Sequence, residues 1–110
     1  MQEHVYHLRG YDIFCKVRDN IKLYELRVYD EKRQQLAIGD IIKFVSLDSD
    51  EWCRKQVDGI YVFYDFDDLF KVIPLKDTGL ASTDDVYKYF SKAAIARHGV
   101  VAIKLKGLAD

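Results

Sequence analysis

One short alternating segment, residues 24–28, constrains the fold of this chain more than any other. Three apolar residues there alternate with Glu25 and Arg27. Because successive side chains of a β-strand point to opposite faces, a strand here places Glu25 and Arg27 together on one face. The apolar face must then pack against a core, while the charged face either meets water or lines a cleft. The functional interpretation depends on which of these two it does.

Length and composition predict a single globular domain over residues 1–110. Of the 110 residues, 49% are hydrophobic and 14% aromatic, which suits one hydrophobic core and argues against disorder. No apolar run reaches the length of a membrane span, and the first residues lack a basic region followed by an apolar one. We expect a cytoplasmic protein that makes no contact with a membrane.

The sequence gives no motif for a metal ion or a cofactor, and we expect neither. Cys15 and Cys53 are too few for a disulfide framework or a zinc cluster. His4 and His7 fall on different faces of a short predicted strand, and no third ligand lies near them in the sequence.

Charge is distributed unevenly along the chain. The formal net charge is −1, which argues against a protein held on duplex nucleic acid by bulk charge. Basic residues outnumber acidic ones between Lys16 and Arg33, whereas acidic residues dominate between Asp40 and Asp85. A local basic cleft within an acidic surface is compatible with this pattern, and it would suit a short anionic ligand better than a long polyanion.

The hydrophobic periodicity predicts an α+β fold. Strands are expected at residues 4–8, 24–28, 41–47, 53–64 and 100–106, and helices at 10–19, 65–73 and 82–98. Asn20 suits a left-handed residue after the first helix, Gly39 a tight turn, and Asp58 with Gly59 a bulge. This order of elements predicts a small curved β-barrel of about five strands with flanking helices.

Two helices and one loop carry more detailed expectations. The first helix is expected to bury Ile13, Phe14, Val17 and Ile21. The last helix is expected to bury Val86, Tyr89, Phe90, Ala93 and Ala94. Residues 30–37 are expected to form a charged loop.

Several blocks, in order along nearly the whole chain, resemble the ASCH family. These blocks are Lys22-x-x-Glu25-x-Arg27, Asp30-x-Lys32-Arg33, Gly39-Asp40-x-Ile42-x-Phe44, Tyr64-x-Phe66-x-x-Leu69 and His98-Gly99-Val100-Val101-Ala102-Ile103. The resemblance implies a PUA-like fold, with a cleft beside the barrel lined by the lysine and the Glu-x-Arg strand. The family is generally taken to bind RNA or nucleotides. Some small bacterial members hydrolyse N4-acylated cytidine, and a ribonuclease activity has been attributed to another.

The resemblance carries over residue by residue, with one departure. Lys22 matches the lysine that precedes the strand, and Arg27 matches the arginine that ends the motif. Glu25 stands where the deacylating members carry a nucleophilic threonine. A carboxylate can act as a general base or accept a hydrogen bond from an amino group, but it cannot replace a threonine oxygen in the same mechanism.

The residue types in these blocks suit a nucleotide. Arg27 offers a planar fork, Lys22 a point charge for phosphate, and Glu25 an acceptor. Strict alternation places Lys22 off the face that Glu25 and Arg27 share, so it joins them only if the chain twists before the strand. Four further residues are candidate ligand contacts: Lys32 and Arg33 for phosphate, and Tyr29 and Tyr64 for stacking on a base.

Three functional hypotheses follow. The first is an RNA-, nucleotide- or nucleoside-binding domain that uses Lys22, Glu25 and Arg27. The second is a small hydrolase acting on a modified nucleoside or on RNA, with Lys22 and Glu25 as an acid–base pair. The third is a protein-interaction domain, for which the cleft is closed and Glu25 pairs with Arg27. The sequence leaves the ligand and the oligomeric state open.

Overall fold

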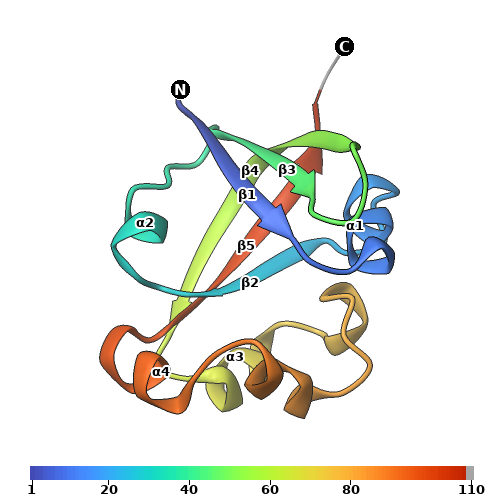
Figure 1. Cartoon of the computed structure of the whole chain (residues 1–110). Helices are drawn as coiled ribbons and strands as arrows, with labels where there is room; N and C mark the ends of the chain where they lie inside the picture. The colour runs from blue at the N-terminus through green and yellow to red at the C-terminus, as the bar shows by residue number, and fades with distance from the viewer. Residues whose placement is uncertain (109–110) are drawn as a thin grey trace.

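A computed structural model describes residues 1–108 of the chain. The elements are β1 (Glu3–Leu8), α1 (Tyr11–Arg18), β2 (Tyr24–Val28), α2 (Glu31–Gln34), β3 (Ile41–Ser46), β4 (Trp52–Phe63), α3 (Phe66–Val72), η1 (Leu75–Asp77), η2 (Thr83–Lys88), α4 (Lys92–His98) and β5 (Val100–Gly107). The five strands form one curled sheet in the order β1-β3-β4-β5-β2, with helices around it (Figure 1). The predicted α+β class and the curved five-stranded sheet with flanking helices are confirmed.

The sheet mixes one parallel pair with three antiparallel pairs. β1 runs parallel to β3, whereas the β3–β4, β4–β5 and β5–β2 pairs are antiparallel. The register of β4 shifts between Val57 and Gly59, as the Asp58-Gly59 pair predicted. β1 and β2 are the two edges of the sheet, and the curl brings these edges toward each other.

Two hydrophobic cores cover the two faces of the sheet. The inner core, within the curl, contains Tyr6, Leu8, Phe14, Val17, Leu36, Ile42, Phe44, Val57, Val101, Ile103 and Leu105. The outer core contains Leu26, Val28, Phe66, Leu69, Ile73, Val86, Ile95, Val100 and Ala102. β5 contributes to both cores, which explains the uninterrupted apolar run at its start. Figure 1 shows α3, α4 and the segment between them gathered at one end of the sheet.

The first helix is shorter than predicted, and one residue of its stripe is misplaced. α1 ends at Arg18, and Asn20 adopts the expected left-handed conformation, with φ 61°. Ile21 lies beyond this turn and is 57% exposed, so the prediction that it is buried is wrong. The left-handed residue changes the direction of the chain and ends the helical spacing.

Two other local predictions are corrected. Residues 30–37 are not only a loop, because Asp30 caps one helical turn, α2, by accepting a hydrogen bond from the Arg33 backbone N–H. The predicted helix over 82–98 is two pieces, η2 and α4, because Ser91 accepts a bond from Ala94 N and starts a new helix. Ala93 is therefore exposed, and Ile95 is the residue that α4 buries. None of the helices within residues 1–108 is long and apolar enough to cross a membrane.

Candidate functional site

The charged face of β2 lies inside the curl. Glu25 is paired in register with Ile103 of β5 and Arg27 with Val101, both of which belong to the inner core. Leu26 and Val28 point the other way, into the outer core. The alternation predicted from the sequence is therefore present, and it places a carboxylate that is only 3% exposed at the edge of an apolar interior.

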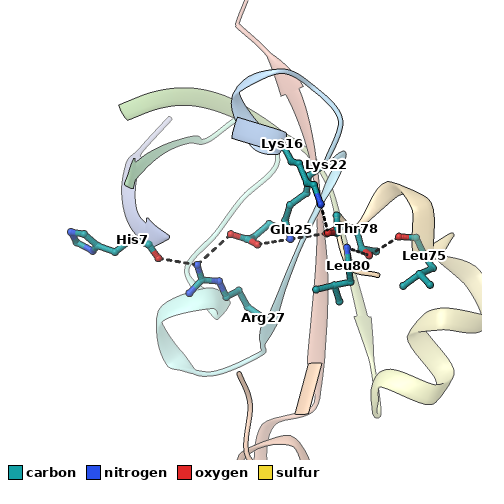
Figure 2. Close-up of polar contacts among 9 residues, drawn as sticks. His7, Lys16, Lys22, Glu25, Arg27, Leu75, Thr78 and Leu80 are labelled. Carbon is teal, nitrogen blue, oxygen red and sulfur yellow. Dashed lines mark hydrogen bonds and ion pairs between the residues drawn. The ribbon is translucent and has the colours of Figure 1, made fainter. Parts of the chain in front are cut away.

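Lys22 joins this face, which alternation along the strand alone would not allow. The turn after α1 is held by bonds from the N–H groups of Ile21 and Lys22 to Lys16 O, both 2.9 Å. The Lys22 ammonium then lies 3.2 Å from Glu25 Oε1 and donates to Thr78 O at 2.9 Å. Figure 2 shows Glu25 between Lys22 and Arg27. The twist that the sequence left open thus brings all three residues together.

Glu25 is held as a charged carboxylate. Its Oε2 accepts a hydrogen bond from Arg27 Nη2 at 3.3 Å, while Lys22 approaches Oε1. Burial acts to raise the pKa of Glu25, but the charges and hydrogen bonds of Lys22 and Arg27 outweigh it and hold that pKa below its ordinary value. A buried carboxylate with this pKa is ionised at neutral pH, which makes it a weak general base.

A pocket of about 240 Å³ opens beside these charges. Lys22, Glu25 and Arg27 form its charged floor. Its apolar lining comes from Leu8, Ile13, Leu26, Leu80, Val86, Tyr89 and Phe90, and His7 and Arg9 complete the lining. The Glu25–Arg27 pair expected for an interaction domain is present, but the closed cleft expected with it is not. The volume is below the range usual for drug-sized ligands, so the pocket suits one small molecule or one unit of a larger one.

Two lysines form hydrogen bonds to the segment just before Leu80, where the apolar wall of the pocket (Leu80, Val86, Tyr89 and Phe90) begins. Lys22 donates to Thr78 O, and Lys16 donates to the next carbonyl, Gly79 O, at 3.1 Å. Gly79 has a positive φ of 78°, and a Cβ there would lie 3.3 Å from the Lys22 side chain. A glycine is favoured at this position because it adopts the positive φ without strain, and because a Cβ here would press on the Lys22 side chain.

The remaining predicted contacts lie outside the pocket lining. Tyr29 packs against the inner core, and Tyr64 is 79% exposed between β4 and α3. Lys32 donates to Val5 O at 3.1 Å, and Arg33 pairs with Asp30 at 3.3 Å. Lys32 and Arg33, both on α2, lie beside the ring of Tyr6 on β1 and not in the pocket itself.

Sequence reasoning missed most of the pocket lining. The sequence marked Val86, Tyr89 and Phe90 only as the apolar side of a helix, and nothing in it related them to Glu25, more than fifty residues away. The sequence suggested His7 only as a possible metal ligand, which was rejected, and it gave no signal for Arg9. No group of three or more His, Cys, Asp or Glu side chains within residues 1–108 could hold a metal ion.

The comparisons with known proteins support the fold. No family model matches the chain, and no curated protein matches it. The chain is similar to the crystal structure of the hypothetical protein PH0355, with a TM-score of 0.81 and 26% identity over 98% of this chain and 100% of that chain. It is also similar to the solution structure of protein PF0455 from Pyrococcus furiosus, with a TM-score of 0.75 and 26% identity over 98% of this chain and 99% of that chain. Both matches extend over nearly the whole chain, and neither names an activity.

Proposed function

We propose that this protein binds one nucleoside unit, as a free nucleotide or as part of an RNA, in the pocket above Lys22, Glu25 and Arg27. One observation carries the proposal: a buried, ionised polar floor faces an apolar and aromatic wall across a pocket of about 240 Å³. A nucleobase has this same division, with flat apolar faces and a polar edge. The resemblance to ASCH domains, which are PUA-like, supports the same class of ligand.

The floor matches the edge of a base or the charge of a phosphate. Arg27 uses Nη2 for Glu25 and for His7 O, which leaves its other guanidinium N–H groups for a ligand. Each oxygen of Glu25 has one cationic partner, and a carboxylate can accept about two hydrogen bonds per oxygen. The floor can therefore offer both donors and an acceptor.

The wall can stack on a base. Tyr89 is 60% exposed and its ring centroid lies 6.4 Å from that of Phe90. Stacking of a base on an aromatic side chain contributes roughly 1–3 kcal/mol. Tyr89, which the sequence assigned to a core, is therefore the aromatic residue we expect to contact the ligand.

The hydrolase hypothesis has less support. It requires Glu25 to exchange a proton near neutral pH, whereas Lys22 and Arg27 keep the pKa of Glu25 low. No observation at the site identifies a nucleophile in place of the threonine. Binding without turnover is the function that we propose.

Isothermal titration calorimetry tests the proposal. The wild-type protein is titrated with each common ribonucleoside, its 5′-monophosphate, N4-acetylcytidine and short single-stranded RNAs, and each mixture is analysed by chromatography for product. We expect at least one compound to bind without being consumed. We also expect Tyr89→Ala to weaken that binding by about tenfold, because it removes a stacking surface.

Tyr87→Ala is the matched control. Tyr87 belongs to the same short segment and is also exposed, at 43%, but does not line the pocket. Its removal is expected to leave the affinity unchanged. The proposal is wrong if nothing in the panel binds, or if Tyr87→Ala and Tyr89→Ala behave alike. Product formed by the wild type would replace binding with catalysis as the function. Loss of that product in Glu25→Gln would assign the catalysis to Glu25 only if circular dichroism shows that the variant is folded.

A further inference from the structure

A second cluster of cations lies beside the pocket, where the two edge strands of the sheet, β1 and β2, and the helix α2 approach one another. Three cationic groups surround the ring of Tyr6: Arg33 at 4.7 Å, and Arg27 and Lys32 at 5.0 Å each from the centroid. We call Tyr6, Arg27, Lys32 and Arg33 the seam cluster. Arg27 belongs to both the seam cluster and the pocket floor.

The seam cluster and the pocket floor have too few carboxylates for their cations. Among the residues that the structure describes, two carboxylates, Glu25 and Asp30, pair with the four cations Lys22, Arg27, Lys32 and Arg33. Within residues 1–108, no carboxylate forms an ion pair with Lys32. Lys32 is an exposed residue. Desolvation of its ammonium is the largest cause that lowers its pKa, and the neighbouring charges of Arg33 and Arg27 lower it further.

Within residues 1–108, two buried polar atoms of the seam cluster have no hydrogen-bond partner. They are Tyr6 Oη and Arg33 Nε. Tyr6 is 0% exposed, and the cationic groups of Arg27, Lys32 and Arg33 lie within 5.0 Å of its ring centroid. Buried polar groups are nearly always satisfied in folded proteins. Two unpartnered donors beside an unneutralised lysine therefore indicate a site for a group rich in acceptor oxygens.

The cations of the seam cluster make contacts that an anion can replace. Lys32 donates to Val5 O at 3.1 Å, and Arg27 Nη2 donates to His7 O at 3.5 Å. Both acceptors lie on β1, whose backbone pairs with β3 on its other side. Hydrogen bonds from a cation to an anionic oxygen are shorter and about twice as strong as bonds between neutral groups. Both side chains are long enough to turn from these carbonyls to an anion placed between them.

We propose that the seam cluster is a phosphate subsite adjoining the pocket, so that the ligand is a phosphorylated nucleoside. This inference rests on the proposed function, because the base of the same ligand would occupy the pocket. Arg27 would contact both parts, while Lys32, Arg33 and the Tyr6 hydroxyl would contact the phosphate alone. The phosphate can belong to a free nucleotide or to the backbone of an RNA, since both present the same acceptor oxygens.

The test is the affinity for a ribonucleoside 5′-monophosphate divided by the affinity for the matching ribonucleoside, both measured by calorimetry. Each ribonucleoside is compared with its 5′-monophosphate, with a single-stranded trinucleotide and with inorganic phosphate alone. For the wild type we expect the phosphate to increase the affinity by about tenfold or more, because a hydrogen bond to a charged group usually contributes that much to binding. In Lys32→Gln this ratio is expected to fall most of the way to one. Tighter binding of the trinucleotide than of the 5′-monophosphate would assign the phosphate to RNA, and the reverse would assign it to a free nucleotide.

Two further variants separate phosphate binding from a structural role. Lys71→Gln removes the same charge from an exposed position on α3 and should preserve the wild-type ratio. Tyr6→Phe should lower the ratio if the hydroxyl contacts phosphate. If the hydroxyl is only an unsatisfied buried group, Tyr6→Phe should instead raise the melting temperature and leave the ratio unchanged, which would contradict its assigned role.

The outcomes distinguish this inference from the proposed function. If nucleosides bind but the wild-type ratio is close to one, the phosphate subsite is wrong and the pocket assignment stands. If inorganic phosphate binds in a manner that depends on Lys32 but no nucleoside binds, the anion site stands and the proposed occupant of the pocket is wrong. If nothing binds, both are wrong.

Discussion

At the scale of single residues, the central feature is a buried carboxylate between two cations. Glu25 is 3% exposed, with Lys22 and Arg27 on either side. A buried charge is tolerated only when it is paired and hydrogen-bonded, and removing one member leaves the others uncompensated. Glu25 therefore matters for the fold as well as for any ligand.

This arrangement predicts that Glu25→Gln is strongly destabilising. The variant leaves Lys22 and Arg27 close together without a counter-charge, and we expect the free energy of unfolding to fall by about 3–5 kcal/mol. Urea denaturation measures the change. Glu31→Gln, at an exposed position on α2, is the matched control and should alter the free energy by less than about 0.5 kcal/mol. A change at Glu25 as small as that of the control would contradict the pairing.

The same carboxylate predicts the direction of the response to pH. The pKa of Glu25 is lower in the folded protein than its ordinary value of 4.5. Its contribution to stability is therefore present above pH 4.5 and is lost as the pH falls toward the pKa of the folded state. Denaturation midpoints measured across the acid range should decline more steeply for the wild type than for Glu25→Gln. Parallel curves would contradict the lowered pKa.

At the scale of elements, the junction between α4 and β5 depends on one glycine. Gly99 has φ 71° and ψ −168°, a conformation essentially restricted to glycine, and a Cβ there would lie 2.9 Å from Phe63 O. Its carbonyl also accepts a bond from Tyr29 N at 3.0 Å. This residue therefore sets the position at which β5 enters the sheet beside β2.

Substitution of this glycine should be costly. We expect Gly99→Ala to lower the free energy of unfolding by roughly 2–3 kcal/mol, because the variant adds backbone strain and a collision with a carbonyl oxygen. Gly107→Ala is the control, since a Cβ at Gly107 meets nothing within 4 Å. Thermal unfolding followed by circular dichroism compares the two. Equal melting temperatures would show that the junction adapts without cost.

The elements also show where sequence reasoning succeeds. Strand alternation is a local property, so the faces of Glu25 and Arg27 were predictable, as were the turn at Gly39 and the bulge near Gly59. The break between η2 and α4 was harder to predict, because a helical pattern continues through it. Ser91 carries the signal for the break, as a serine cap in the middle of an apparent helix.

At the scale of the whole molecule, the candidate site is assembled from segments that the sequence does not relate. Lys22 reaches Glu25 because the turn before β2 is held by Lys16 O and by a 2.8 Å bond from Leu23 N to Asp77 O. The aromatic wall comes from residues 80–90, and the seam cluster needs β1 and α2 to meet. These are tertiary contacts, which periodicity and propensity do not encode.

The molecule also offers a rival surface, which makes the pocket assignment testable. On the outer face of the sheet, Lys43 and Arg54 lie 4.7 and 4.9 Å from the ring of Trp52, which is 51% exposed. A basic and aromatic surface of this kind is also typical of single-stranded nucleic-acid binding. Arg54 is already paired with Glu3 at 2.6 Å. A pocket of about 250 Å³ adjoins Arg54, but among the residues that the structure describes neither Trp52 nor any other aromatic residue lines it. We therefore expect ligands at the pocket above Glu25 and not at Trp52.

Chemical-shift mapping tests this central claim most directly. The uniformly 15N-labelled protein is titrated in turn with each common ribonucleoside 5′-monophosphate, and the backbone amide shifts are followed. The account predicts that the perturbed amides cluster at residues 7–9, 22–27 and 80–90, with a second group at 32–33 that inorganic phosphate alone also perturbs. Perturbations centred on Trp52 and its neighbours, or none at all at millimolar ligand, would contradict it.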